Sequence, residues 1–146
     1  IDEMVFVGDS ACRSEFEEEA KSLQVNCRFT GFLDKPGVFK ALEEAHALIL
    51  PSKSEGFPKV VGEAMASGCI PIVSDISCIR EYIEHGKNGF VLDNINASAI
   101  YSVLKRLFCI SNDLFKDIIS SNQEEAQRFT YEHYNQKLLE LVLKDE

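Results

Sequence analysis

One stretch near the middle of the chain constrains the fold more than any other: residues 50–68, LPSKSEGFPKVVGEAMASG. It begins as the end of an apolar strand, breaks at Pro51, crosses a polar loop and restarts at Pro58 as a helix rich in small residues. Proline is favourable at the first helical position because its missing N–H would have no intrahelical partner there. The stretch therefore predicts a strand, a loop and a helix N-terminus in direct succession.

This predicted junction has the properties of an anion-binding site. With Pro58 as the first helical residue, the backbone N–H groups of Lys59 and Val60 point out of the helix end without partners. The helix dipole places partial positive charge at the same point, and Gly56 lets a ligand come close to the backbone. A diphosphate group matches this arrangement.

Two carboxylates flank the expected anion site. Glu55 lies in the loop, and Glu63 lies five residues into the helix, roughly 7–8 Å along its axis at 1.5 Å per residue. An ionised carboxylate accepts hydrogen bonds from hydroxyls and repels phosphate. The order of Glu55, the helix end and Glu63 along the chain predicts sugar hydroxyls at Glu55, a diphosphate at the helix end and ribose hydroxyls at Glu63. An ordinary solvated acid explains either residue alone, whereas the pair in this setting favours a ligand site.

The remaining chain alternates apolar strands with helices. Strands are expected at residues 3–7, 25–30, 47–50, 70–74 and 90–92, and helices at 11–23, 38–45 and 79–84. Short loops and near-continuous apolar strands predict an α/β fold with a Rossmann-like parallel sheet sandwiched by helices. Ligands of such sheets bind beyond the carboxyl ends of the strands, where the loop containing Glu55 begins.

The last third of the chain is expected to be helical. Apolar residues recur at helical spacing from Asn96 to Leu107, which predicts one amphipathic helix packed on the sheet. Further helices are expected at 114–129 and 131–144, so that C-terminal helices occupy about 111–146. The whole chain, residues 1–146, is expected to form a single nucleotide-sugar-binding domain.

Composition excludes several classes of protein. No apolar run approaches the roughly 18 residues of a membrane span, and the first residues lack a signal-peptide pattern, so we expect a cytoplasmic protein. The five cysteines are odd in number and lack C-x-x-C spacing, which favours reduced thiols over disulfides or zinc. A formal charge of −9 disfavours binding to nucleic acid or anionic membranes.

The central stretch also resembles a known family. The resemblance rests on two runs, Glu55-Gly56-Phe57-Pro58 and Glu63-Ala64-Met65-Ala66-x-Gly68-x-x-Pro71. Together they are similar to the E-x7-E segment of retaining GT-B glycosyltransferases of the group 1, or family 4, type. Flanking runs fall in the family's order: Val5-Phe6-Val7-Gly8-Asp9, Phe29-Thr30-Gly31-Phe32, Leu50-Pro51-Ser52, Glu81-Tyr82-Ile83 and Gly86-x-x-Gly89-Phe90-Val91.

The resemblance implies a role for the chain and its residues. It identifies the chain as the C-terminal, donor-binding half of a hexosyltransferase in polysaccharide or glycoconjugate biosynthesis, which moves a sugar from a nucleotide-sugar donor to an acceptor hydroxyl with retention. It assigns catalysis to Glu55, contacts with the nucleobase to Phe32, Leu33 and Lys35, and no metal or other cofactor. It assigns donor binding to Gly56, Phe57, Pro58, Lys59, Val60 and Glu63.

The chain also departs from the family pattern. The family's domain begins with one more strand and helix, which carry a basic pair for the diphosphate, and an N-terminal acceptor domain precedes them. We therefore expect a fragment that is inactive without its other half, with any peripheral association at the inner membrane residing in that half. Ser77 and Cys78 stand where the family places two glycines near the donor sugar. Because their side chains occupy space that glycine would leave free, the sequence does not indicate which sugar fits.

Two alternatives remain at this point. A GT-B-like sugar-nucleotide epimerase shares the sheet and the nucleotide site, and a non-catalytic nucleotide-binding module shares the fold. The complete segment from Glu55 to Gly68 fits transferases better than epimerases. The presence of both Glu55 and Glu63 argues against a degenerate site, which needs neither.

Overall fold

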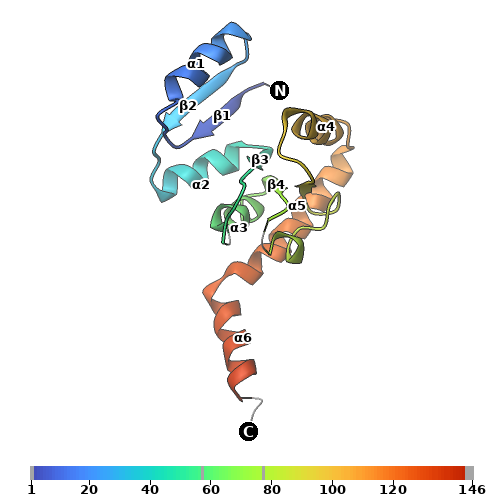
Figure 1. The fold of residues 1–146 in the computed structure, drawn as a ribbon. Coiled ribbons are helices and arrows are strands. Elements are labelled where there is room, and N and C mark those ends of the chain that lie inside the picture. Colours follow the sequence, from blue (N-terminus) through green and yellow to red (C-terminus); the bar gives the residue numbers. More distant parts are fainter. Residues whose placement is uncertain (1, 57, 77, 144–146) are drawn as a thin grey trace. The chain divides into compact units, whose positions relative to one another are not determined.

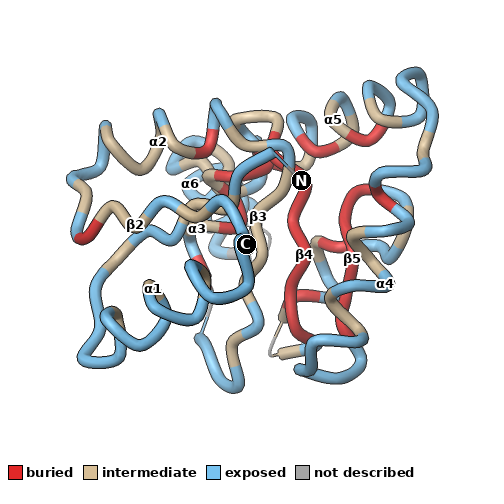
Figure 2. Tube along the Cα trace, turned by 90° about the horizontal axis from the view of Figure 1, so that it is seen from above, coloured by how far each residue is buried: buried red, intermediate tan, exposed pale blue. Residues whose placement is uncertain are grey.

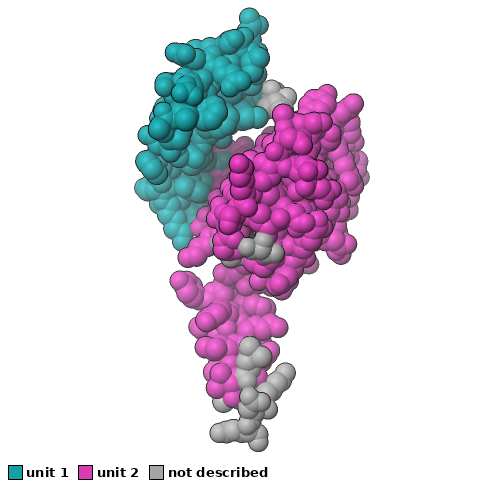
Figure 3. All heavy atoms as spheres, in the orientation of Figure 1, with its two compact units in different colours: residues 1–41 teal, residues 42–146 magenta. Residues whose placement is uncertain are grey.

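The structure is a computed structural model, and it describes residues 2–56, 58–76 and 78–143. The chain divides into two compact units, Ile1–Ala41 and Leu42–Glu146, which Figure 3 distinguishes by colour. The boundary falls inside one helix, α2 (Lys35–Glu44).

The first unit is built on two parallel strands, β1 (Met4–Val7) and β2 (Cys27–Gly31), joined by helix α1 (Arg13–Ser22) (Figure 1). Met4 lies opposite Cys27, and the register shifts after Phe6 so that Val7 lies opposite Gly31. The rings of Phe6 and Phe29 stack with centroids 4.7 Å apart. Both strands therefore end close together at their carboxyl edge.

Helix α2 begins three residues earlier than the sequence predicted. The carboxylate of Asp34 accepts a hydrogen bond from the backbone N–H of Gly37 at 2.9 Å, which caps the first turn. Lys35 and Pro36 then occupy the first two helical positions, where the absent N–H of proline removes no intrahelical bond. The prediction was wrong because it placed the start of the helix after Pro36.

The second unit holds a three-stranded parallel sheet. Its strands are β3 (Ala47–Leu50), β4 (Ile70–Ser74) and β5 (Phe90–Leu92), in the order β3-β4-β5. In Figure 2 the central strand β4 and its neighbour β5 are buried along their length. The α/β Rossmann-like class is confirmed, while the strands of the described residues form two hydrogen-bonded sheets rather than one.

Among the described residues of this unit, four α-helices and two 3-10 helices follow the first strand. They are α3 (Lys59–Ala66), η1 (Ile79–Glu81), α4 (Ala97–Phe108), α5 (Asn112–Ala126), η2 (Gln127–Phe129) and α6 (Tyr131–Leu143). The side chains of Asn96 and Ser111 cap α4 and α5 by accepting backbone N–H groups three residues on. Within the described ranges, no helix has the length and apolarity that crossing a membrane requires.

The predicted helix at 79–84 is shorter than expected. Only Ile79–Glu81 is helical, as a 3-10 turn. The side chain of Asn88 explains the difference, because its amide donates to the carbonyl of Tyr82 at 2.8 Å and accepts from the N–H of Glu84 at 2.8 Å. These bonds take the place of the backbone bonds that a longer helix would make.

Apolar side chains cover both faces of the three-stranded sheet, because alternate residues of a strand point to opposite faces. On one face α3 contributes to a cluster of Val61, Met65, Val73, Ile79, Ile83, Val91 and Ala126. On the other face α4 contributes to a cluster of Ile70, Ile72, Phe90, Leu92, Leu107 and Ile118. Helix α5 contributes to both clusters. Between its two contributions lies Asn122, fully buried and without a hydrogen-bond partner among the described residues.

The five cysteines are free, and burial separates one of them from the rest. Burial raises the pKa of the Cys69 thiol to about 12, because the thiolate loses its hydration there. We expect iodoacetamide at pH 8 to label the exposed Cys12 and Cys109 in the folded chain and to leave Cys69 unmodified. Peptide mass spectrometry before and after unfolding in urea measures this. Equal labelling of Cys12 and Cys69 in the native chain would contradict it.

Candidate functional site

The predicted ligand site lies where β3 leaves the sheet. Leu50 is opposite Val73 in the parallel register, and the hydroxyl of Ser74 donates to the carbonyl of Leu50 at 3.5 Å. The chain then runs through a polar loop into α3. The junction therefore stands at the carboxyl edge of the sheet, where ligands of parallel sheets bind.

The structure corrects the start of α3. Pro58 is the N-cap, with an extended ψ of 97°, and Lys59 is the first helical residue. The carbonyl of Pro58 accepts a hydrogen bond from the backbone N–H of Val61 at 2.9 Å. The proline side chain has no acceptor for the backbone N–H groups of the first helical turn. No side chain among the described residues caps this helix. The open helix end that the sequence predicted thus begins one residue later.

Packing fixes which side of α3 faces outward. Val61, Gly62, Ala64 and Met65 are buried, whereas Lys59 is exposed and Glu63 half-buried. A Cβ at Gly62 would lie 2.7 Å from the ring of Phe129, so glycine allows η2 to pack directly on the helix. Lys59 and Glu63, four residues apart, therefore share the outward face.

A Schellman motif fixes the other end of α3. Gly68 adopts a φ of 77°, its N–H reaches the carbonyl of Met65 at 3.2 Å, and the N–H of Cys69 reaches that of Ala64 at 2.8 Å. The chain then enters β4 directly at Ile70. Both ends of α3 are thereby tied to adjacent strands of the sheet.

Glu55 is exposed in the loop and is held from within it. The hydroxyl of Ser52 donates to Glu55 Oε1 at 3.0 Å. Of the other predicted donor-site residues, Gly56 precedes α3 in the same loop, and Lys59, Val60 and Glu63 lie on α3. Phe57, which the sequence also assigned to the donor, lies outside the described residues.

The predicted base contacts lie in the other unit and differ in their surroundings. Phe32 is 85% exposed. Leu33 is half-buried, and its Cβ is 3.2 Å from where a Cβ of Gly37 would lie, so it anchors the loop against α2. The ammonium of Lys35 lies over the ring of Phe39, 5.8 Å from its centroid. Of the two apolar residues, Phe32 is the more exposed.

An ionic cluster that the sequence analysis missed lies at the same sheet edge as Glu55. Arg80 binds the carboxylate of Asp75 through Nε and Nη2, each at 2.8 Å, and its Nη2 lies 3.5 Å from Asp93. Asp75 follows β4 and Asp93 follows β5, so Arg80 joins the loops after two neighbouring strands. The hydrogen bonds from Arg80 lower the pKa of Asp75 below its ordinary value.

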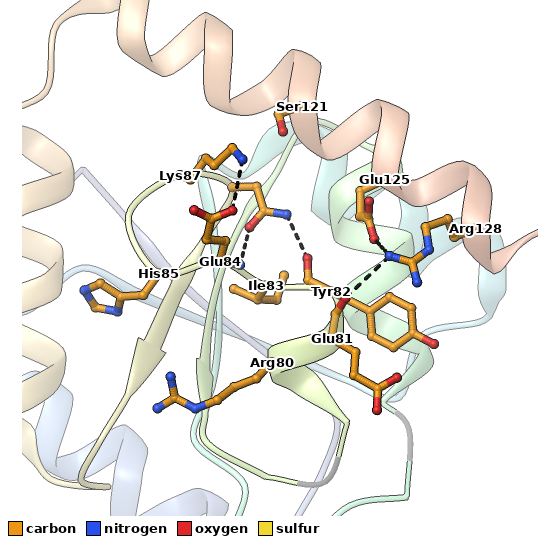
Figure 4. Close-up of a pocket in the computed structure, with 11 residues that line it drawn as sticks. Arg80, Glu81, Tyr82, Ile83, Glu84, His85, Lys87, Ser121, Glu125 and Arg128 are labelled. Carbon is orange, nitrogen blue, oxygen red and sulfur yellow. Dashed lines mark hydrogen bonds and ion pairs between the residues drawn. The ribbon is translucent and has the colours of Figure 1, made fainter.

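A polar pocket of about 460 Å³ lies elsewhere in the second unit, between the segment from Arg80 to Asn88 and helix α5. Figure 4 shows how its charged groups pair with one another: Lys87 with Glu84, and Arg128 with Glu125 and with the carbonyl of Glu81. The guanidinium of Arg128 also covers the ring of Tyr82 at 4.8 Å. This internal pairing leaves the loop–helix junction as the stronger candidate site.

Comparison with known proteins decides the family. Residues 3–136 match the family model for glycosyl transferases group 1. The chain belongs to this family. A putative colanic acid biosynthesis glycosyltransferase, WcaL, of Salmonella typhimurium is 33% identical over 120 residues, which are 77% of this chain and 29% of that protein. The amylovoran biosynthesis glycosyltransferase AmsK of Erwinia amylovora is 27% identical over 79% of this chain and 30% of that protein.

Solved structures of other proteins show the same fold. Anabaena HepE in complex with UDP and glucose superposes with a TM-score of 0.80 at 22% identity, over 96% of this chain and 40% of that one. A sucrose-phosphate synthase of Thermosynechococcus elongatus gives a TM-score of 0.79 at 20% identity, over 97% of this chain and 37% of that one. The chain spans about a third of the length of the curated relatives it matches.

Proposed function

We propose that this chain is the donor-binding half of a retaining glycosyltransferase that uses a nucleotide sugar. The observation that carries the proposal is the junction at α3, where a helix end that no described side chain caps lies between Glu55 and Glu63 in sequence, at the carboxyl edge of the sheet. HepE, which has the same fold, has been crystallised with UDP and with UDP-glucose. The relatives WcaL and AmsK are named for colanic acid and amylovoran biosynthesis, which supports a reaction that adds a sugar to a growing polysaccharide.

Each part of the junction has a role in the proposed reaction. Glu63 accepts hydrogen bonds from the ribose hydroxyls, and the N–H groups of Lys59 and Val60 bind the diphosphate. When the bond to the sugar breaks, negative charge grows on the departing diphosphate, and donors already aimed at it stabilise that charge without rearranging. Glu55, oriented by Ser52, accepts sugar hydroxyls and stabilises the positive charge that develops at the ring.

The acceptor site and the basic groups for the diphosphate belong, in this proposal, to the larger part of the full-length protein, since this chain spans 29% to 33% of its curated relatives. Transfer by the complete protein needs both parts. No metal enters the proposed reaction, and a cytoplasmic location stays a prediction. Sugar transferred to an acceptor, rather than an epimerised donor, is the product that separates this proposal from the epimerase alternative.

Glu63→Gln tests the nucleotide assignment. The substitution keeps the shape of the side chain but removes the charge that strengthens hydrogen bonds from ribose hydroxyls. We expect the affinity for the best-bound nucleoside diphosphate to weaken by about 1.5–3 kcal/mol, the usual contribution of a hydrogen bond to a charged group. Isothermal titration of the chain with uridine, guanosine and adenosine diphosphates measures this.

Glu18→Gln, an exposed acid on α1, is the matched control, because it changes the net charge by the same amount far along the sequence from the junction. Its affinity should equal that of the wild type. Equal affinities of the Glu63→Gln chain and the wild type would remove the ribose assignment. Absence of any nucleoside diphosphate binding by the wild type would remove the donor-site proposal itself.

A further inference from the structure

Gly62, the fourth residue of α3, is buried inside the second unit. Its φ lies outside the positive range that favours glycine, so other residues could adopt the same backbone conformation. Glycine in the interior of a helix is less stable than alanine, because it loses more conformational freedom on folding. What this position requires from glycine is therefore space, since its backbone conformation does not demand one.

The ring of Phe129 fills the space beside Gly62. A Cβ at Gly62 would lie 2.7 Å from Cδ2 of Phe129, 3.0 Å from Cγ and 3.4 Å from Cβ. Carbon atoms in favourable contact lie about 3.5–4.0 Å apart, so a methyl group at residue 62 would push the helix and the ring apart by roughly 1 Å. One of the two partners must move to accommodate it.

Contacts on both sides hold the ring of Phe129 in place. The ring of Tyr82 packs against it with centroids 4.8 Å apart. The neighbouring residue Arg128 lies over the same tyrosine ring at 4.8 Å, donates to the carbonyl of Glu81 at 3.4 Å and pairs with Glu125 (Figure 4). The segment η2, which carries Phe129, is therefore connected to the chain that follows β4.

The first turn of α3 is held less firmly than this ring. Pro58 is its N-cap, and no described side chain caps the helix there. The other end is tied into β4, because the N–H groups of Gly68 and Cys69 bond to the carbonyls of Met65 and Ala64. If the helix and the ring are pushed apart, we expect the N-terminal end of α3 to move while its C-terminal end stays in place.

We infer that Gly62 is a positioning residue for the donor site: without a side chain it lets α3 lie directly on the ring of Phe129, and this contact sets the position of the first turn. Lys59, Val60 and Glu63 lie on the same two turns of the helix. Binding groups must be held within about 0.5 Å of their productive geometry, a tolerance smaller than the shift that a methyl group would cause. The inference rests on the proposed function, to which it adds a residue that touches no ligand.

Titration of the 146-residue chain with the nucleoside diphosphate that the wild type binds best tests the inference. We expect Gly62→Ala to weaken binding about tenfold, close to the loss of one hydrogen bond to a charged group. Ala66→Ser is the matched control, because it also adds one heavy atom to α3, at an exposed position. Its affinity should equal that of the wild type.

Removal of the ring separates positioning from a general loss of stability. With Phe129→Ala, the methyl group of Gly62→Ala would meet only the Cβ of residue 129, at 3.4 Å, which is an ordinary contact. Phe129→Ala should lower the melting temperature, because the ring contact with Tyr82 is lost. We nevertheless expect this variant and the double variant to bind within about threefold of the wild type. If affinity merely followed stability, Phe129→Ala would bind weakly as well.

The outcomes distinguish this inference from the proposed function. A wild-type chain that binds no nucleoside diphosphate overturns both. Wild-type binding that Gly62→Ala leaves unchanged overturns the role of Gly62 alone, and so does a double variant that binds as weakly as Gly62→Ala. If a thermal melt shows that Gly62→Ala does not fold, the double variant is compared with Phe129→Ala. Equal affinities then support the inference, and a tenfold difference overturns it.

Discussion

Replacement of Phe90 by alanine should lower the free energy of unfolding by about 3–5 kcal/mol, the usual range for a phenylalanine removed from a core. Phe90 is 1% exposed on β5 and belongs to the cluster under α4. The ring of His85 packs edge-on against it at 5.7 Å, and the guanidinium of Arg106 lies 5.4 Å from its centroid. Truncation therefore loses transfer energy, leaves a cavity and removes the support of both neighbours.

Urea denaturation followed by circular dichroism measures this loss. Phe108→Ala is the matched control, since Phe108 ends the neighbouring helix α4 with 60% of its surface exposed. Substitutions at exposed positions usually change stability by no more than about 0.5 kcal/mol. A similar loss at both positions would show that the face of the sheet under α4 is not the packed core described above.

Glu55→Gln in the full-length protein should reduce turnover by about 10²–10³-fold, the usual effect of removing one group that stabilises charge in a transition state. In the proposed reaction the negative charge of Glu55 stabilises the positive charge that develops on the sugar ring. Glutamine can still accept the hydroxyl of Ser52, so the loop keeps its shape. The affinity for a nucleoside diphosphate without sugar should stay within about twofold, because Glu55 meets the sugar and not the diphosphate.

Initial rates of sugar transfer, together with titration of the nucleoside diphosphate, measure the two effects separately. Glu84→Gln is the control, since Glu84 is exposed and pairs with Lys87 at the polar pocket. Its turnover should match the wild type. Loss of nucleotide affinity in proportion to turnover in the Glu55→Gln protein would place Glu55 at the diphosphate or the ribose instead of the sugar.

The strands of the second sheet were predictable from sequence to the residue. Each of them, Ala47–Leu50, Ile70–Ser74 and Phe90–Leu92, is a short run that is apolar except for Ser74 and that is followed by a proline or an aspartate. Such a run carries apolar side chains toward both faces when both faces of its sheet are covered, and the two core clusters show that coverage here. The position of the loop–helix junction was also predictable, because the junction comes directly after the end of β3 in the chain.

Helix boundaries were less predictable, because single side chains decided them. The carboxylate of Asp34 starts α2 early, the amide of Asn88 replaces helical bonds after Glu81, and the extended ψ of Pro58 delays α3 by one residue. Apolar periodicity carries no information on these bonds. Local side-chain hydrogen bonds compete with helix continuation on nearly equal terms, so a small difference in free energy fixes the boundary.

The cluster of Asp75, Arg80 and Asp93 could not be predicted from the sequence at all. Its residues approach one another because β4 and β5 are adjacent and parallel, which brings the loops after both strands to one edge. The hydrogen bond from Arg13 on α1 to the carbonyl of Phe29 on β2 depends in the same way on the pairing of β1 with β2. Contacts of this kind become visible only when the order of strands in the sheet is known.

Helix α5 has a consequence for how the second unit unfolds. Ile118 packs in the cluster on one face of the sheet and Ala126 in the cluster on the other face, so α5 is held by both clusters. If either cluster comes apart, α5 loses part of its packing and the side-chain amide of Asn122 becomes exposed to water. The two clusters should therefore unfold in a single cooperative transition, and the backbone amide protons around them should exchange at a common rate.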